Sequence, residues 1–312
     1  MVCGDEVSSL TLANRLGIVI SARFGTAPAF TLESHIMDEL IIESGRANLH
    51  YWKDLWKFRE LFYLLSWRDI LVRYKQTVVG VAWALLRPFI TMVLFTVIFE
   101  QIGRIPSPKG VPYPVLMYCA MLPWQLFSSA LSDSGTSIIA NGNLISKIYF
   151  PRLIVPAVPV IVGLIDFLIA MVFLVLLLAW FQFAPDWRII ALPFFIFLAL
   201  IASLGAAFLF SALTVKYRDF RFVAPFIVQF GMYASPVVYS SSNLYDKYPQ
   251  WSLLYAMNPM VSVIDGFRWS LLRGAEPIHI PEFCISLGML GVLLMIGVWY
   301  FRQTERSFAD II

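Results

Sequence analysis

Long apolar runs dominate the chain beyond residue 80, and they predict helices that cross a membrane. A helix of about 20 apolar residues is long enough to span the hydrocarbon core of a bilayer. Windows of this kind occupy residues 81–102, 114–139, 153–181, 189–215, 222–240 and 281–301. Pro225, Gly231 and Pro236 interrupt the fifth window, which makes it the least regular of the set. We therefore expect an all-α integral membrane protein with six transmembrane helices.

A second pattern, with the period of an α-helix, precedes these runs in residues 49–78. Apolar side chains share one face of this helix, and charged side chains share the opposite face. The apolar face holds Leu55, Phe58, Leu61, Phe62, Leu65 and Val72, and the charged face holds Lys53, Lys57, Glu60, Arg68 and Lys75. Such a helix suits the membrane interface, with its cations toward anionic headgroups. We expect an amphipathic interface helix here; a helix of a soluble core is the alternative.

These patterns divide the chain into four parts. Residues 1–48 contain no apolar run long enough for a signal peptide, and we expect them to form a cytoplasmic extension. The interface helix at 49–78, a six-span membrane domain at 79–302 and a cytoplasmic tail at 303–312 follow it.

The polar and aromatic stretch between the fifth and sixth windows, residues 240–281, is too long for a simple turn. Bulky apolar residues recur at helical spacing in 253–257 and 260–272, and Pro259 separates the two segments. We expect two short helices that re-enter the outer half of the bilayer before the last span. A cap over the end of the bundle is the alternative.

The positions of the basic residues orient the spans. With both termini in the cytoplasm, the inside segments hold 17 of the 23 Lys and Arg residues, and the outside segments hold 6. Cytoplasmic segments of membrane proteins are enriched in Lys and Arg. The sequence therefore predicts a multi-pass membrane protein with both ends cytoplasmic.

Composition supports the membrane assignment and excludes other classes of protein. Charged residues make up 14% of the chain and hydrophobic residues 59%, whereas ordinary soluble domains have about 25% charged residues. The net charge of +3 is too small to indicate a nucleic-acid partner. The three cysteines and three histidines lack the spacing of a metal or redox motif, so no metal site is expected.

Six sequence phrases occur in series along the chain. They are WRDILVRYKQTVVGVAWALLRPF at 67–89, LPW at 122–124, NGNLISKIYFPRLIVP at 141–156, KYRDFRFVAPF at 216–226, SPVVYS at 235–240 and NP at 258–259. Over residues 50–302 their order and spacing resemble the membrane subunit of ABC-2 type exporters of polysaccharides. That family exports O-antigen, capsule and teichoic acid chains.

The resemblance implies a half-transporter and not an enzyme. Two copies would form the membrane pathway, and two copies of a separate P-loop ATPase would bind ATP and magnesium beneath them, so this chain would carry no cofactor. The sequence agrees, because it contains no GxxxxGK[ST] phosphate-binding motif. The implied substrate is a glycan, O-antigen first among the candidates, linked to a polyprenyl pyrophosphate carrier.

In this family a coupling helix between the second and third spans docks in a groove of the ATPase, and residues 141–152 occupy that position. The residues implied in coupling are Leu144, Ile145, Lys147, Ile148, Tyr149, Phe150 and Arg152. They form an apolar knob flanked by two cations, and an exposed apolar patch is typical of a binding surface. A tight connector lying on the bilayer is the alternative.

Basic residues near the cytoplasmic face are candidates to bind the diphosphate where the lipid-linked substrate enters, because guanidinium forks suit phosphate oxygens. The candidates before the first span are Arg59, Arg68, Arg73 and Lys75. The loop at 216–221 is also basic. It has three alternative roles: contact with the ATPase, attraction of the pyrophosphate, or orientation of the spans.

Aromatic residues make up 16% of the chain. In the family that it resembles, aromatic rings line the channel, and sugar rings stack on them. The candidates are Trp83, Phe89, Tyr118, Trp124, Phe127, Phe230, Tyr233 and Tyr239. The alternative for each ring is an interfacial belt or a lipid-facing surface.

Three ionisable residues and a seam of small residues fall inside the predicted spans. Arg87 and Asp133 each lie about 10 Å inside a span, so we expect them to pair, directly or between two copies. Asp166 lies near the middle of the third span without an evident partner, and we expect it to form a structural hydrogen bond. The small residues of the fourth span, which predict close helix packing, are Ser203, Gly205, Ala206, Ala207 and Ser211.

Other functional classes remain as alternatives. They are an ABC-2 permease for a small molecule or lipid, an ATP-independent channel, and a membrane-bound glycosyltransferase or lipid-modifying enzyme. The last class would need acidic residues or histidines clustered at a membrane face, and the sequence has no such cluster.

Overall fold

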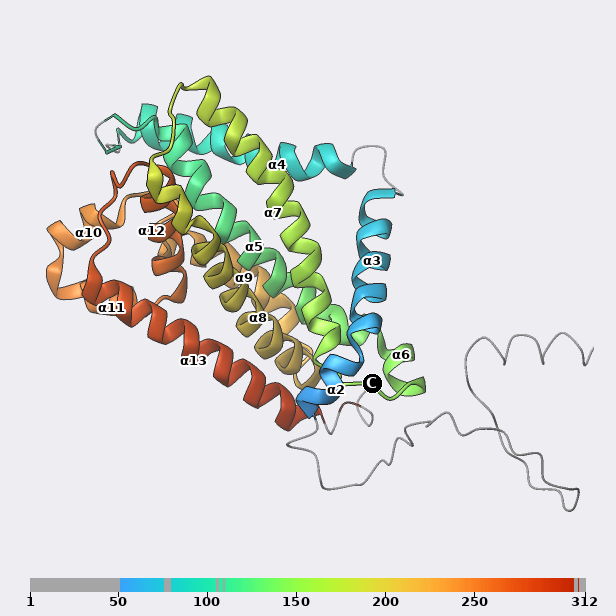
Figure 1. The fold of residues 1–312 in the computed structure, drawn as a ribbon. Helices are drawn as coiled ribbons and strands as arrows, with labels where there is room; N and C mark the ends of the chain where they lie inside the picture. The colour runs from blue at the N-terminus through green and yellow to red at the C-terminus, as the bar shows by residue number, and fades with distance from the viewer. Residues whose placement is uncertain (1–50, 76–79, 105–106, 109, 306–307, 309–312) are drawn as a thin grey trace, which may run out of the picture. The chain divides into compact units, whose positions relative to one another are not determined.

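The computed structural model describes residues 51–75, 80–104, 107–108, 110–305 and 308 (Figure 1). These residues belong to one compact unit of the chain, residues 47–312. All regular elements among them are helices, as the apolar pattern predicts. The predicted extension at 1–48 lies outside the described residues, as do residues 306–307 and 309–312 of the predicted tail.

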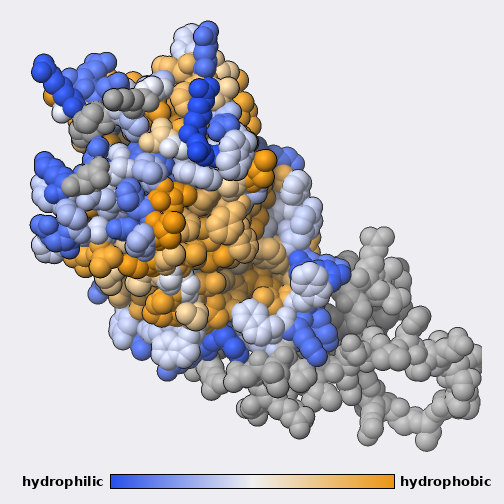
Figure 2. Space-filling view, turned by 60° about the vertical axis from the view of Figure 1, so that its left-hand side comes forward, coloured by the Kyte–Doolittle hydropathy of each residue, from blue (hydrophilic) through white to orange (hydrophobic). Residues whose placement is uncertain are grey.

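Among the described residues, five helices are long and apolar enough to cross a membrane. They are α4 (Gly80–Phe95) with its π-helical continuation η1 (Thr96–Ile102), α5 (Tyr113–Ala140), α7 (Ile154–Trp180), α8 (Leu192–Lys216) after the short η2 (Trp187–Ala191), and α13 (Ile280–Thr304). They coincide with five of the six predicted windows. On the face shown in Figure 2, hydrophobic surface forms a broad band with hydrophilic surface above and below it.

The fifth predicted window forms a shorter helix. α9 (Phe220–Ala234) has 15 residues, which is about 22 Å of helix against about 30 Å of hydrocarbon core. It ends at Ala234 because Pro236 disfavours helical backbone at Ser235, which is extended with φ −105° and ψ 157°. The structure therefore contains five candidate spans and one short apolar helix where six spans were predicted.

α8 packs most extensively against α5 and α13. The predicted packing seam on α8 is confirmed, because Ser203, Ala207 and Ser211 are fully buried. At Gly205 the seam meets Gly297 of α13. A Cβ atom added to Gly297 would lie only 2.4 Å from the carbonyl oxygen of Gly205. The two helix backbones therefore touch at this crossing, which only small residues allow.

The predicted interface helix forms two consecutive helices, α2 (Tyr51–Lys57) and α3 (Arg59–Lys75). Most of its predicted apolar face packs on protein and not on lipid, because Leu65 and its neighbours join a buried cluster with Ile154 and Phe301. A different surface of the two helices is exposed and aromatic, with spacings of four and seven residues. It consists of Trp52, Trp56, Tyr63 and Trp67.

The outer stretch forms α10 (Ser241–Lys247), η3 (Pro249–Trp251), α11 (Ser252–Ala256) and α12 (Pro259–Leu271). The two predicted helices and the break at Pro259 are confirmed. Asn258 caps α12, because its side-chain oxygen accepts a hydrogen bond from the backbone N–H of Met260 at 3.0 Å. Almost every residue of α12 is buried, against α5, α8 and α13. The outer helices are thus built into the bundle.

Candidate functional site

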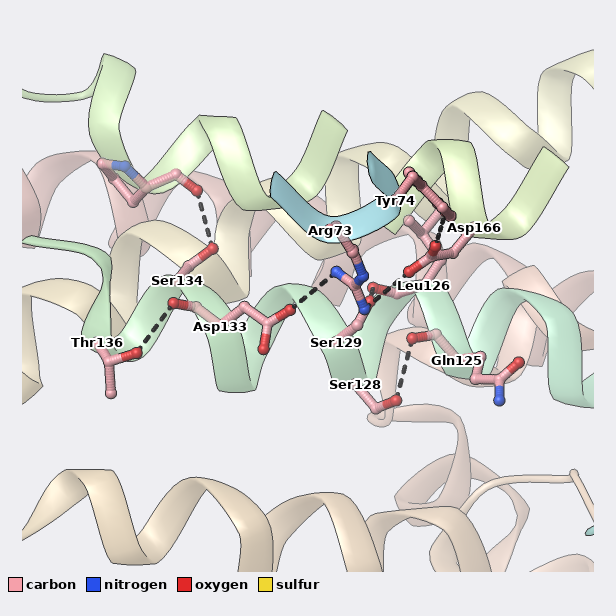
Figure 3. A network of polar contacts seen from close by, with 11 residues as sticks. Arg73, Tyr74, Gln125, Leu126, Ser128, Ser129, Asp133, Ser134, Thr136 and Asp166 are labelled. Atoms are coloured by element: carbon pink, nitrogen blue, oxygen red, sulfur yellow. Dashed lines mark hydrogen bonds and ion pairs between the residues drawn. The ribbon is translucent and has the colours of Figure 1, made fainter. Parts of the chain in front are cut away.

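An ion cluster joins α3 to α5 and α7 (Figure 3). The guanidinium of Arg73 lies between two carboxylates, 2.9 Å from Oδ2 of Asp166 and 3.5 Å from Oδ2 of Asp133. The Tyr74 hydroxyl donates a hydrogen bond to the other oxygen of Asp166. Burial and this neighbouring carboxylate raise the pKa of Tyr74 well above its usual value, so the hydroxyl remains a donor. The cluster therefore fastens the end of α3 to two spans.

This cluster corrects one expectation and confirms another. Within one copy, Asp133 makes its ion pair with Arg73, and Arg87, which is exposed on α4, acts on Asp133 only through a longer-range electrostatic interaction. The hydrogen bond expected at Asp166 is confirmed, because Asp166 accepts one from Tyr74; its charged partner, Arg73, was not evident from the sequence. The reason is that α3 runs beside α7, so Tyr74 meets a side chain 92 residues away in the sequence. A pair between Arg87 and Asp133 of two copies stays a prediction.

Replacing Arg73 with glutamine is expected to destabilise the fold, because Asp133 and Asp166 then face each other without their shared cation. The two carboxylate side chains are 48% and 23% exposed, so the loss should be about 1–2 kcal/mol, below that of a fully buried pair. Thermal denaturation of the detergent-solubilised chain measures this loss. The R73Q/D166N double variant should recover most of it, and equal losses in both variants would contradict the prediction.

The four basic residues predicted to receive the diphosphate are not gathered at one place. Arg73 is held by the two carboxylates. Arg68 donates to the side-chain oxygen of Asn141 at 3.1 Å. Arg59 and Lys75 lie at opposite ends of α3, about 24 Å apart along its axis. One phosphate group cannot contact both of them, so a role in substrate uptake stays a separate prediction for each.

The predicted coupling segment forms α6 (Gly142–Lys147) followed by extended backbone at Ile148. Its apolar residues fall into two groups. Ile145 and Phe150 are buried, with 7% and 3% exposure, and Leu144 packs beside them. Ile148 and Tyr149 project from the surface, with 50% and 60% exposure. Of the predicted apolar knob, these two side chains are the ones that can contact a partner.

The two predicted flanking cations also differ. Lys147 is exposed. Arg152 donates to the backbone carbonyl of Glu305, next to the end of α13, and its guanidinium lies 6.0 Å from the ring of Phe308. Burial raises the pKa of Glu305, whose carboxylate accepts a hydrogen bond from Tyr51 at 3.1 Å. Arg152 thus holds the coupling segment against the end of the last span.

An open cavity of about 970 Å³ lies beside the coupling segment. Residues of α2, the coupling segment and the end of α13 line it, Tyr149 and Trp299 among them. The exposed ring of Tyr149 therefore borders a recess and not a flat surface, which is a suitable shape for a docking partner.

The aromatic rings that were predicted to line the channel differ in how exposed they are. Tyr118, Trp124 and Phe127 are buried within the single chain. Trp124 is in van der Waals contact with Gly231 of α9, because a Cβ there would lie 2.8 Å from its ring. The exposed candidates are Phe89, Phe230 and Tyr233, with 39%, 54% and 49% exposure. Tyr239 is half-buried, and the side chain of Trp83 lies outside the described residues.

These elements stand within a stretch that matches a known family. Residues 60–272, more than half of the chain, match the family described as ABC-2 type transporter. The chain belongs to this family.

Relatives of this ABC-2 family member align over most of its length. It is 26% identical over 261 residues to the O-antigen export system permease protein RfbA of Myxococcus xanthus, covering 83% of this chain and 98% of that protein. It is 27% identical over 255 residues to a Klebsiella pneumoniae protein of the same name, covering 81% and 95%. It is 26% identical over 249 residues to the polysialic acid transport protein KpsM of Escherichia coli, covering 77% and 92%.

Sequence reasoning missed a buried polar network in the outer segment of this ABC-2 family member. Arg268 of α12 is fully buried and donates to the backbone carbonyls of Tyr239 at 2.8 Å and Val237 at 3.1 Å. Asp265, one helical turn earlier, accepts a hydrogen bond from Ser241 at 2.7 Å. α12 thereby holds the backbone that follows α9.

Glu276 completes the network. It is buried and accepts hydrogen bonds from Ser240 at 2.7 Å and from Ser242 at 3.0 Å. The sequence did contain a signal for this network, because Asp265 and Arg268 lie three positions apart in an apolar helix. Ionisable residues in such a helix are costly unless they have partners.

Proposed function

We propose that the chain is the permease subunit of an ATP-driven exporter that moves a polyprenyl-pyrophosphate-linked polysaccharide, O-antigen first among the candidates, across the inner membrane. The observation that supports this proposal most directly is the alignment, which covers 98% and 95% of the length of two relatives named as O-antigen export permeases. The match to the ABC-2 type transporter family supports the same function. ATP and magnesium are assigned to a separate ATPase subunit, and no cofactor to this chain.

The proposed complex contains two copies of the chain and two copies of the ATPase, with both termini of the chain cytoplasmic. The exposure of α9 supports a partner copy. Among its residues only Ala224 is buried, whereas Phe222, Phe226 and Phe230 are more than half exposed. An apolar face of this extent needs a cover of lipid or protein. We assign the exposed rings of Phe89, Phe230 and Tyr233 to the wall of a glycan channel between the copies.

We further propose that α9 is a short fifth span and that α2 and α3 lie in the membrane interface. The exposed stripe of Trp52, Trp56, Tyr63 and Trp67 supports the interfacial position, because Trp and Tyr are enriched where the bilayer meets water. The burial of α12 among the spans supports re-entry of the outer helices.

Two other functions would give different results in the same assay. An ABC-2 permease for a small molecule or lipid would also bind an ATPase, but its ATP hydrolysis would not respond to a lipid-linked glycan. An ATP-independent channel would bind no ATPase.

The test is purification of the tagged chain from its native membranes in mild detergent, with identification of bound proteins by mass spectrometry and an ATPase assay. A stoichiometric P-loop ATPase is expected. Its affinity should fall by roughly 100-fold or more in the I148D/Y149D variant, because two exposed apolar contact residues are lost. No ATPase under several mild conditions would contradict the proposed function.

Matched variants separate docking from folding. The conservative I148V/Y149F variant keeps an apolar surface and should bind the ATPase normally. Tyr248 is 46% exposed in the outer segment, and Y248D should also leave binding unchanged. Equal losses in Y248D and I148D/Y149D would mean that an exposed charge disturbs the fold, and would contradict the assigned docking surface.

A further inference from the structure

A hollow at the ends of α5 and α8 combines two arginines with neutral hydrogen-bonding groups. Its volume is about 450 Å³, within the range of roughly 300–1,000 Å³ for small-molecule sites. The polar side chains in its wall are those of Asn143, Ser146, Arg218 and Arg221, and Ile139 and Val215 are among its apolar residues. The basic loop at 216–221 thus faces the coupling helix α6 across a defined recess.

The charge of this hollow is not neutralised by its own wall, which contains no acidic residue. Within the described residues, the guanidinium of Arg218 has no hydrogen bond or ion pair. The guanidinium of Arg221 lies 4.7 Å from the ring of Phe222, a contact that orients the cation and leaves its charge available. Arg73, in contrast, already lies between two carboxylates.

The start of α9 adds to the positive potential. This helix has 15 residues and begins beside the hollow at Phe220; its N-cap residue, Asp219, is exposed and makes no cap hydrogen bond, and the N–H groups of Phe220 and Phe222 donate to the backbone carbonyls of Tyr217 and Asp219. Backbone N–H groups at such an end favour an anion, and phosphate groups bind there readily. The two guanidinium groups in the wall of the hollow therefore carry the anion site, and the helix dipole of α9 adds only a secondary contribution.

The apolar part of the wall distinguishes between the possible anions. Ile139 and Val215 belong to the last turns of two spans, α5 and α8, so the hollow adjoins the apolar surface of the bundle. A phosphate attached to a lipid brings an apolar chain to this point, whereas a carboxylate of a soluble ATPase brings none. Two cations next to an apolar surface therefore favour a phosphate that is attached to a lipid.

We infer that this hollow binds the diphosphate group of a polyprenyl-linked substrate, with Arg218 and Arg221 on the phosphate oxygens and Asn143 and Ser146 as neutral partners. The inference rests on the proposed function and deepens it. It selects substrate attraction among the three roles open to the loop at 216–221, and it moves the phosphate site from α3 to the start of α9.

The test uses the purified full-length chain in neutral detergent and geranylgeranyl diphosphate as the probe, with binding followed by thermophoresis. The R218Q/R221Q variant should bind the probe at least about tenfold more weakly, because two charge-assisted contacts are lost. The matched control is R104Q/K247Q, which removes the same charge from two exposed residues outside the hollow and should bind within about twofold of the native chain. Normal binding by R218Q/R221Q, or an equal loss in both variants, would overturn the inference.

A second arm separates the two sources of a lipid phosphate. Phosphatidylglycerol in mixed micelles should compete poorly with geranylgeranyl diphosphate; equal competition would identify the site as one for bulk anionic lipid and would overturn the inference. ATPase binding should be the same in R218Q/R221Q and in the native chain, and its loss would assign the loop to the ATPase instead. If the native chain binds an ATPase while the hollow binds no diphosphate, the inference fails and the proposed function stands.

Discussion

Changing Gly297 to valine is expected to prevent α8 and α13 from packing and to cost about 3 kcal/mol or more of folding stability, at or above the upper end for overpacked sites. A Cβ atom at this position would lie 2.4 Å from the carbonyl oxygen and 3.2 Å from the carbonyl carbon of Gly205. Both are backbone atoms of the facing helix, so no side chain can rotate to make room. The two helices must separate, and the most extensive helix pair in the bundle is lost.

Size-exclusion chromatography and thermal denaturation in detergent measure this effect. The matched control is Gly291→Val on the same helix, because a Cβ atom at Gly291 meets no other atom within 4 Å. Stability of this control should change by less than about 1 kcal/mol, as helix propensities differ little between these residues. A similar loss at both positions would show that contact with Gly205 is not the cause.

Replacing Arg268 with methionine is expected to release the backbone after α9 from α12. The carbonyl groups of Val237 and Tyr239 would lose the guanidinium donor that now binds them at 3.1 and 2.8 Å. A buried acceptor without a partner costs about 1–3 kcal/mol, so the pair should cost about 2–6 kcal/mol. Hydrogen–deuterium exchange should rise first in residues 236–247, and the midpoint of thermal denaturation should fall.

Two variants control for charge and for loss of an arginine. R268K keeps the cation but lacks the planar fork that reaches both carbonyls, so it should recover only part of the loss. Arg273 is exposed and donates to one carbonyl, that of Ala184; R273M should cost less than about 1.5 kcal/mol. Full recovery in R268K would mean that charge alone, and not the paired hydrogen bonds, holds this segment.

The sequence alone predicted those helices whose characteristic pattern lies within about 20 consecutive residues. The apolar windows predicted α4 with η1, α5, α7, α8 and α13, because crossing a bilayer imposes a length and an apolar composition on each helix. The small residues of α8 predicted close packing, and Pro259 predicted the break before α12. The phrases in series also indicated the ABC-2 family that the match over residues 60–272 shows.

The pairing of charges required the tertiary structure. Arg73 belongs to the helix before the first span, and sequence order alone gave no reason to place it near Asp133 or Asp166. Depth within a span suggested Arg87 as the partner of Asp133, but α4 and α5 pack together without bringing these two side chains into an ion pair. Packing of α3 against α7 decided the outcome.

The direction of individual side chains also depended on packing. Ile145 and Ile148 looked alike in the coupling segment, yet one is buried and the other is half exposed. The same holds for Tyr118 and Phe230 among the aromatic candidates. Hydrophobicity along the chain thus determined which segments are helices and located the five helices that are long enough to cross a membrane. Contacts between residues far apart in sequence decided which charges are neutralised and which side chains remain exposed, because both depend on which helices lie side by side.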